Sequence, residues 1–233
     1  MASKLRSVVD MRAMKAQQQK ISMVTCYDYS MACLIEQSPV DIILVGDSGG
    51  MVQAGYDNTL PVTVDEMIYH ARAVHRGAPR TPVVVDLPYM SYHVSIEDSF
   101  RNAGRIMKET GAGAVKLEGG EAFVPVIGAM VAASIPVVGH LGLTPQSVQA
   151  FGGFRVQGRD EQAAARIRRE AQLVQQAGAC ALVLELVPEP LAQQITAELD
   201  IPTIGIGAGR YCDGQVLVIN DLLGMNAAFN PVF

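Results

Sequence analysis

The amino-acid sequence predicts an α/β protein with a (β/α)8 barrel, on three observations. Short apolar runs rich in β-branched residues recur eight times, the stretches between them have helical periodicity, and a length of 233 residues suits one barrel domain. Strands that alternate with helices pair in parallel and are buried on both faces, which explains why the runs are continuously apolar. A doubly wound sheet usually has fewer strands, so the barrel is favoured.

Each predicted strand is a short apolar run followed by room for a helix. The eight expected strands are Ile21–Cys26, Ile42–Val45, Val83–Val85, Ala114–Leu117, Val137–Gly139, Ala181–Leu184, Thr203–Ile206 and Val216–Ile219. Helical spacing is clearest at Val64–Arg76, Ile96–Thr110, Glu121–Ala133 and Glu161–Ala177.

The two ends of the chain complete this prediction. We expect residues 1–20 to form an N-terminal helical segment and residues 1–233 to form a single barrel domain. The stretch that follows the eighth strand, Asp221–Phe233, is too short for a full closing helix. We therefore expect the barrel to lack one outer helix.

Composition and charge exclude several classes of protein. The chain is 49% hydrophobic and carries a net charge of −5 without a basic cluster, so we expect neither nucleic acid nor an anionic membrane as partner. No run of about 18 apolar residues occurs and the N-terminus lacks a continuous apolar segment, which predicts a cytoplasmic protein without a membrane span. The four cysteines form no C-x-x-C pair, and we expect reduced thiols.

Reactive or hydrogen-bonding side chains follow the C-terminal ends of nearly all the predicted strands. In a barrel these ends converge on one face, where such folds carry their chemistry. The whole set therefore predicts an active site more strongly than any single member does. The members are Tyr27, Asp28, Asp47, Ser48, Asp86, Lys116, Glu118, His140, Glu185 and Gly205–Gly209.

Several members of this set also have a purely structural interpretation. Asp47 and Ser48 precede a glycine pair and suit a helix cap as well as a binding site. Lys116 and Glu118 are two positions apart on a strand, so they point to the same side and form either an internal ion pair or a site. His140 is more often a hydrogen-bonded structural histidine, and we expect it behind the site.

The carboxylates indicate the chemistry of the expected site. Glu185 lies in the most apolar surroundings of any carboxylate in the chain, where it needs a partner or becomes more basic, as a general base requires. Carboxylates from three other strand ends, beside Ser48 and Lys116, are hard oxygen ligands that suit Mg²⁺ rather than zinc. A 2-oxo acid would complete the coordination shell.

Two motifs suggest other functions and are rejected. Gly46–Gly50 spells the string around the nucleophile of chymotrypsin-like proteases, but in those enzymes the catalytic histidine precedes the serine and here no histidine precedes His70. Gly205–Arg210 resembles a dinucleotide fingerprint, but Arg210 takes the place of its third small residue and no βαβ unit follows. A glycine-rich turn after the seventh strand fits better, either as a plain turn or as a place where ligand approaches the backbone.

A longer pattern resembles the ketopantoate hydroxymethyltransferase family. The matching segments run from about residue 20 to about residue 224 in the order found in that family. They are Thr25–Asp28, Leu44–Ser48, Asn58–Thr63, Asp86–Pro88, Val115–Gly120, Gly139–Gln146, Phe151–Gly158, Leu184–Glu185, Gly205–Gly209 and Asp213–Gln215.

The resemblance implies a fold, a reaction and roles for the site residues. It implies a barrel of the phosphoenolpyruvate/pyruvate type, and transfer of a one-carbon unit from 5,10-methylenetetrahydrofolate to 3-methyl-2-oxobutanoate, which gives 2-dehydropantoate in pantothenate synthesis. A homo-oligomer, often a decamer in that family, is implied as well. In the implied site, Mg²⁺ is held by Asp47, Asp86 and Glu118, the oxo acid is bound by Asp47, Ser48, Asp86 and Lys116, and the proton is accepted by Glu185.

The chain departs from the family pattern at three places. Gly49 stands where we expect a leucine, which predicts looser packing behind Asp47 and Ser48. Ser38-Pro39 stands where a small residue and a glycine are expected, which affects a loop. The short C-terminus bears on assembly more than on chemistry.

Two other functions remain as alternatives. One is a related Mg²⁺-dependent enzyme of the isocitrate lyase or phosphoenolpyruvate mutase kind, but the Lys-Lys-Cys-Gly-His loop of those enzymes is absent from the sequence. The other is a catalytically silent barrel that serves as a binding protein. The joint presence of five charged residues argues against a silent barrel, namely Asp47, Asp86, Lys116, Glu118 and Glu185.

Overall fold

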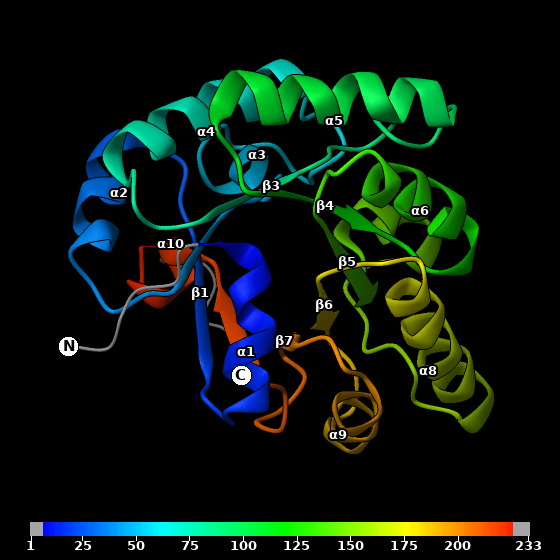
Figure 1. Cartoon of the computed structure of the whole chain (residues 1–233). Helices are drawn as coiled ribbons and strands as arrows, with labels where there is room; N and C mark the ends of the chain where they lie inside the picture. Colours follow the sequence, from blue (N-terminus) through cyan, green and yellow to red (C-terminus); the bar gives the residue numbers. More distant parts are fainter. Residues whose placement is uncertain (1–6, 226–233) are drawn as a thin grey trace.

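The computed structural model describes residues 7–225, which form a closed barrel of eight parallel strands (Figure 1). Strands pair in chain order and β8 returns to β1, so the predicted fold is confirmed. The strands are β1 Ile21–Thr25, β2 Ile42–Val45, β3 Val83–Asp86, β4 Ala114–Glu118, β5 Val137–Gly142, β6 Ala181–Glu185, β7 Thr203–Ile206 and β8 Gly214–Leu217.

Helices cover the outside of the barrel. Figure 1 shows α4 and α5 side by side along one part of the barrel wall, with α6, α8 and α9 continuing around it. The helices are α1 Met11–Ala16, α2 Tyr29–Glu36, α3 Gly49–Val52, α4 Val64–Gly77, α5 Ile96–Thr110, α6 Val124–Ala132, α7 Val148–Phe151, α8 Glu161–Gln176, α9 Glu189–Glu198 and α10 Ile219–Leu222, and short 3₁₀ turns lie at Val8–Asp10, Glu121–Phe123 and Pro145–Ser147.

Local sequence explains where the longest helices begin and end. Thr63 and Glu66 form a capping box at the start of α4, in which each side chain accepts a hydrogen bond from the backbone N–H of the other residue. Ser95 caps α5, which ends at Gly111 in the left-handed conformation that glycine adopts without strain. The apolar stripes of α4 and α5 face the strands, so helix and sheet share one core.

Alternation along each strand sends one residue into the barrel and the next toward the helices. The inward positions form apolar layers, for example Val84, Val138 and Val183, which pack together in the barrel interior. Two residues further toward the carboxyl ends of the same strands, the layer becomes polar with Asp86, His140 and Glu185. The strand register therefore places a polar layer directly on top of an apolar plug.

The N-terminal segment closes the opposite end of the barrel. Met11 of α1 is fully buried and belongs to the same apolar cluster as the barrel interior. Lys15 forms an ion pair with Asp213 at 2.9 Å and donates to the carbonyl oxygens of Thr196 and Ile201. These partners precede β7 and β8, so α1 covers the end of the barrel away from the polar layer.

The predicted boundaries of the eighth strand were wrong. The strand covers Gly214–Leu217 rather than Val216–Ile219, and Ile219 begins α10 instead. Gly214 pairs with Ile21 of β1, where a Cβ atom would lie 2.4 Å from the Ile21 carbonyl oxygen. Glycine thus lets β8 approach β1 closely, although glycine in a sequence usually indicates a turn. The expected lack of a closing helix falls partly on residues 226–233, which lie outside the described residues.

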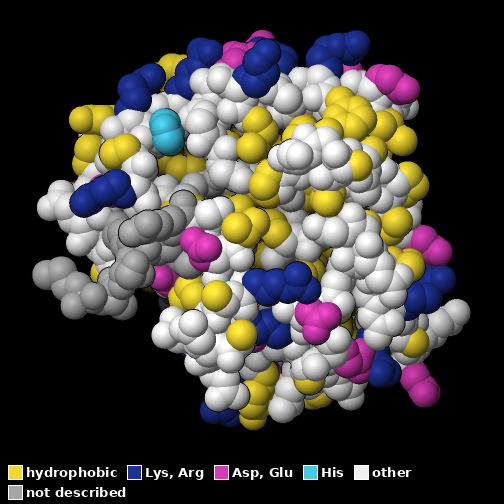
Figure 2. Space-filling model, in the orientation of Figure 1, with side chains coloured by type: hydrophobic (Ala, Val, Ile, Leu, Met, Phe, Trp, Pro, Cys, Tyr) yellow, Lys and Arg dark blue, Asp and Glu magenta, His cyan; other side chains and the backbone are white. Residues whose placement is uncertain are grey.

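The surface agrees with the absence of a basic stripe in the sequence. On the face shown in Figure 2, basic and acidic side chains are interspersed around the edge with apolar side chains between them. Across residues 7–225, no helix has both the length and the apolar composition that a bilayer crossing requires.

Candidate active site

One cavity at the carboxyl ends of the strands is lined by every residue expected to hold the metal, bind the oxo acid or accept the proton, but not by Tyr27, Asp28 or, apart from Ile206, Gly205–Gly209. The cavity has a volume of about 500 Å³ and opens to the surface. Its charged or hydroxyl-bearing lining includes Asp47, Ser48, Asp86, Lys116, Glu118 and Glu185. Residues far apart in the sequence thus meet because every strand of the barrel ends on the same face.

A backbone or side-chain N–H donor holds one oxygen of each of three buried carboxylates. Gln146 Nε2 donates to Asp47 Oδ2 at 2.7 Å, and the Gln146 backbone N–H donates to Glu118 Oε2 at 2.9 Å. The Asp47 backbone N–H donates to Asp86 Oδ2 at 3.1 Å. These bonds fix the orientation of each carboxylate, so its second oxygen has a defined direction.

Lys116 is the cation among these carboxylates. Its Nζ lies 3.1 Å from Asp86 Oδ1 and 3.9 Å from Glu118 Oε1, and the side chain is 5% exposed. Burial disfavours the ammonium group, but the surrounding carboxylates outweigh this effect and raise the pKa of Lys116 above its ordinary value. Lys116 thus forms an internal ion pair, and it does so in the wall of the cavity, so the ion-pair interpretation does not exclude a role in binding.

The cluster holds more negative than positive charge. Burial raises the pKa of Asp47 well above its usual range, and repulsion by Asp86 and Glu118 raises it further. Burial also raises the pKa of Asp86, although Lys116 opposes this. A further positive charge placed among these side chains would stabilise their ionised forms.

The carboxylates do not form a ready-made metal cage. Within residues 7–225, no three His, Cys, Asp or Glu side chains are grouped so that they hold a metal ion by themselves. The expected set of Asp47, Asp86 and Glu118 is therefore not preassembled. Both oxygens of Glu118 already have partners, Gln146 on one side and His140 on the other.

The two aspartates nevertheless fit a hard divalent cation. Asp86 Oδ1 is buried and has no hydrogen bond within the described residues, and only the Lys116 ammonium group lies beside it. Mg²⁺ commonly binds through one or two carboxylates and takes its remaining ligands from water and substrate oxygens. Asp86, through its Oδ1, and Asp47, which neighbouring carboxylates repel, are two carboxylates that could bind such an ion.

His140 is a buried, hydrogen-bonded histidine, as expected, and it also lines the cavity beside the expected site residues. Its Nδ1 is 3.3 Å from Glu118 Oε1 and 3.2 Å from Lys116 Nζ, and its Nε2 is 3.2 Å from Glu185 Oε2. Burial disfavours the imidazolium, but the contacts with Glu118 and Glu185 outweigh this and raise the pKa of His140 to about 8. His140 thus connects Glu185 with the other carboxylates, and Glu185 has the partner that its surroundings demand.

Ser48 is bound by Tyr27 and does not act as a cap. The Ser48 hydroxyl lies 2.9 Å from the Tyr27 hydroxyl, and its side chain makes no capping hydrogen bond to α3. This partner also rules out the protease-like interpretation of Gly46–Gly50, because that mechanism requires a histidine at the serine. Asp28, in contrast, is a cap, since it accepts from Met31 N–H at the start of α2.

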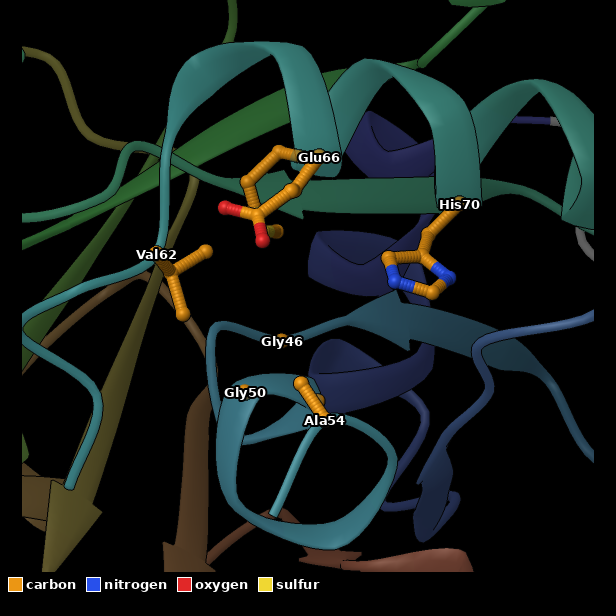
Figure 3. Close-up of a pocket in the computed structure, with 8 residues that line it drawn as sticks. Gly46, Gly50, Ala54, Val62, Glu66 and His70 are labelled. Carbon is orange, nitrogen blue, oxygen red and sulfur yellow. The ribbon is translucent and has the colours of Figure 1, made fainter. Parts of the chain in front are cut away.

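A small cavity lies behind the loop that carries Asp47 and Ser48 (Figure 3). Its volume is about 20 Å³, enough for one water molecule. The lining includes Gly46, Gly49, Gly50, Ala54, Val62, Glu66, Met67 and His70. Gly49 itself is closely packed, because a Cβ atom there would lie 2.8 Å from the Tyr27 ring, and the looser packing expected from the sequence stays a prediction.

Sequence reasoning missed the residues that orient the carboxylates. Gln146 holds Asp47 and Glu118, and Tyr92 donates to Gln146 Oε1 at 2.8 Å while it accepts from Glu118 N–H. Both residues are buried, but neither carries a charge that would single it out in a sequence. Thr59 also lines the large cavity, and its buried hydroxyl has no hydrogen-bond partner within residues 7–225.

The glycine-rich segment after β7 is a turn, as predicted. Gly207 and Gly209 have φ angles of +59° and +78°, a left-handed conformation in which glycine is unstrained. No helix follows within this segment, since the chain passes directly to β8. The dinucleotide interpretation is therefore excluded by the local structure.

The sequence matches one protein family over almost its whole length. Residues 6–233 match the family model described as ketopantoate hydroxymethyltransferase. The chain is 58% identical to 3-methyl-2-oxobutanoate hydroxymethyltransferase of Syntrophus aciditrophicus (strain SB) over 222 residues, which cover 95% of this chain and 82% of that protein. It is 54% identical to the protein of the same name from Desulfotalea psychrophila (strain LSv54 / DSM 12343), over 98% of this chain and 82% of the relative.

Solved structures resemble this barrel at much lower identity. A complex of phosphonopyruvate hydrolase with oxalate and Mg²⁺ superposes with a TM-score of 0.70 at 12% identity, over 94% of this chain and 84% of the other. 2,3-Dimethylmalate lyase, a member of the phosphoenolpyruvate mutase/isocitrate lyase superfamily, gives 0.68 at 17% identity, over 97% and 85% of the two chains. At these identities the likeness supports the fold alone.

We predict that Gly49→Ala destabilises the protein. The added Cβ atom must displace the Tyr27 ring, and overpacking of this kind costs about 1–3 kcal/mol in the free energy of unfolding. Urea unfolding of the variant measures this cost. Gly104→Ala is the matched control, because a Cβ atom there meets no neighbour within 4 Å, and equal stability of the two variants would contradict the prediction.

We also predict that Gln146→Leu destabilises the protein. The change leaves Asp47 Oδ2 and the Leu87 carbonyl oxygen without the donor they have in Gln146, at about 1–3 kcal/mol for a buried polar group that loses its bond. Thermal and urea unfolding report the loss. Gln149→Leu in the same region changes an exposed side chain and stays within about 0.5 kcal/mol of the wild type; a similarly small effect at Gln146 refutes the bracing role.

Proposed function

The chain belongs to the ketopantoate hydroxymethyltransferase family, and from this premise we propose that it transfers a hydroxymethyl unit from 5,10-methylenetetrahydrofolate to 3-methyl-2-oxobutanoate. The product is 2-dehydropantoate, a precursor in pantothenate synthesis. The observation that carries this proposal is the convergence of a base, a buried cation and orientated carboxylates in one cavity. The sequence identity of 54–58% to proteins named for this reaction favours it over a mutase, a lyase or a silent barrel.

The reaction joins a carbon nucleophile to a one-carbon donor. Removal of the C3 proton turns the oxo acid into an enolate, and C3 then forms a bond to the methylene carbon of the folate. A water molecule supplies the hydroxyl group of the product. The bonds from the methylene carbon to the folate nitrogens break, and these nitrogens take up the C3 proton and one proton of water, so that tetrahydrofolate leaves.

Glu185 is the proposed base for the first step. It lies at the end of β6 in the cavity and is 3.2 Å from His140 Nε2, which orients the carboxylate. The side chain is 16% exposed, so it remains reachable from the cavity. With a pKa of about 8, His140 is mostly protonated at neutral pH, so it pairs with the ionised Glu185 carboxylate and orients it.

Lys116 and Ser48 are the proposed binding groups for the oxo acid. The Lys116 ammonium group is buried and charged, so it attracts the carboxylate and the keto oxygen on which negative charge develops. The Ser48 hydroxyl is held in place by Tyr27 and offers a hydrogen bond at the loop after β2. Positioning of both reactants by such groups contributes much of the rate.

Asp47 and Asp86 are the proposed direct ligands of Mg²⁺, with Glu118 beside them. When bound, this ion would polarise the keto group and stabilise negative charge on the oxo acid. The resemblance implies Glu118 as a ligand, but both of its oxygens are held by Gln146 and His140. We propose that its negative charge stabilises the ion while Glu118 keeps these contacts. The neighbour solved with oxalate and Mg²⁺ shares only the fold, so this proposal depends on the carboxylates of the chain itself.

The expected homo-oligomer and the cytoplasmic location stay predictions. Light scattering after size-exclusion chromatography measures the first, and fractionation of cells measures the second.

We predict that Glu185→Gln abolishes exchange of the C3 proton. NMR of 3-methyl-2-oxobutanoate in deuterated buffer with Mg²⁺ follows loss of the C3 proton signal without the folate donor. Without a base we expect the exchange rate to fall at least about 100-fold, while binding of the oxo acid changes little because the amide keeps the shape of the side chain. The exposed Glu97→Gln is the matched control, and exchange at the wild-type rate in Glu185→Gln removes this residue from the mechanism.

We predict that Asp86→Asn weakens Mg²⁺-dependent binding of the oxo acid about tenfold or more. The amide can still accept the hydrogen bond from Asp47 N–H but loses the negative charge at Oδ1. Isothermal titration calorimetry with and without Mg²⁺ measures the affinity, and the circular dichroism spectrum checks the fold. Asp200→Asn, an exposed site before β7, is the control; an unchanged affinity for Asp86→Asn speaks against the metal assignment.

A further inference from the structure

The large cavity has more room than the oxo acid needs. Its volume of about 500 Å³ lies in the range of sites that enclose drug-sized ligands. A five-carbon acid bound at Lys116 occupies only part of this space. The rest must admit the second reactant of the proposed reaction, because the two carbon atoms that join have to meet in the same cavity.

The charged cluster and the remaining wall come from different strands. Asp47, Asp86, Lys116, His140 and Glu185 lie on or directly after β2 to β6. The wall formed by β8 and the segment after it is apolar except for one side chain, since it contributes Val216, Val218 and Asp221. In a closed barrel of eight strands, β8 is diametrically opposite β4, so this wall lies across the barrel from Lys116.

Asp221 differs from the other carboxylates of the cavity in having no partner. Each of Asp47, Asp86, Glu118 and Glu185 has a hydrogen bond or an ion pair. The Asp221 carboxylate has neither with any residue in the part of the chain from 7 to 225, and burial alone raises its pKa. A carboxylate in an apolar wall that accepts nothing from the protein is available to accept N–H groups from a ligand.

Its position is fixed by the backbone around it. The backbone N–H of Ile219, at the start of α10, donates to Thr25 Oγ1 of β1 at 3.0 Å, which ties this helix to the barrel. The Asp221 backbone N–H donates to the Val218 carbonyl oxygen at 3.0 Å. The backbone that carries the Asp221 side chain therefore has a defined place in the cavity wall.

We propose that this wall is the subsite of the one-carbon donor and that the Asp221 carboxylate accepts hydrogen bonds from the amino-oxopyrimidine edge of its pterin ring. This inference rests on the proposed function for the identity of the donor. The pterin edge presents neighbouring N–H groups in one plane, which match the two oxygens of a carboxylate as a guanidinium group does. The faces of the ring are apolar and pack against Val216 and Val218.

The geometry also separates the two substrates. The oxo acid binds on the β2 to β6 side, and the pterin is held from the β8 side, so the methylene carbon between them faces the centre of the cavity. Asp221 follows β8, which is opposite the Lys116 strand β4 in the barrel, and it forms no hydrogen bond or ion pair with the groups proposed for proton abstraction, so its loss leaves their contacts intact. Asp221 therefore affects binding of the donor and not formation of the enolate.

The test compares Asp221→Asn with the wild type, and Asp200→Asn serves as a control with the same charge change outside the cavity. Calorimetry measures binding of tetrahydrofolate, and of an analogue in which a methyl group replaces the 2-amino group. Exchange of the C3 proton of the oxo acid with Mg²⁺, in the absence of folate, is measured on the same samples.

We expect Asp221→Asn to bind tetrahydrofolate about tenfold more weakly and to exchange the C3 proton within twofold of the wild-type rate. The methyl analogue should bind the wild type about tenfold more weakly than tetrahydrofolate does, and this difference should disappear in Asp221→Asn, as for two groups in direct contact. Asp200→Asn should behave as the wild type in every measurement.

Three results distinguish failure of the subsite from failure of the proposed function. Unchanged tetrahydrofolate binding in Asp221→Asn, or no binding by the wild type, overturns the subsite. An analogue effect that persists in Asp221→Asn overturns the contact with the pterin edge. Absence of proton exchange in a wild type whose folate binding depends on Asp221 overturns the enolate mechanism and leaves the subsite supported.

Discussion

The site depends on the ion pairs that the buried ammonium group of Lys116 forms with the carboxylates around it. Several carboxylates are enclosed at the carboxyl end of the barrel, and their charges are tolerated only because a cation lies among them. Removal of one partner from such a buried pair costs about 3–5 kcal/mol, since it leaves an uncompensated charge. The same arrangement supports the proposed function, because excess negative charge beside one fixed cation suits a divalent ion together with an oxo acid.

Two neutral side chains, Gln146 and Tyr92, fix the orientation of the carboxylates in this charge cluster. Gln146 donates hydrogen bonds to the side chains of Asp47 and Glu118, and Tyr92 accepts one from the Glu118 backbone N–H. One oxygen of each of these two carboxylates is thereby held in place. The other oxygens face the cavity or the cation. Buried hydrogen bonds of this kind keep the carboxylates in one geometry, which a transferase needs because it must align two reactants.

Apolar and charged residues are separated between the two ends of the barrel, and charged and apolar cavity walls are separated at one end. The apolar layers and α1 close one end, so that stability is provided away from the chemistry. At the other end, strands β2 to β6 carry the charged residues, and the segment after β8 carries a single unpaired carboxylate in an apolar wall. The charged residues of β2 to β6 and the Asp221 side chain therefore belong to different parts of the barrel rim.

The sequence by itself determined the order and type of the elements and most of the cavity lining. Apolar runs and capping residues are local signals, and for this reason the helix Ile96–Thr110 and all eight strands were placed within three residues of their observed bounds. The close contact at Gly214 depends on a neighbouring strand and shifted the eighth. Tertiary structure alone decided which atoms meet: Gln146 reaches Asp47 across 99 positions, His140 lies between two carboxylates, and the Asp221 side chain has no partner among residues 7–225. These contacts join different strands, and their distances follow from closure of the barrel, which no local pattern of residues encodes.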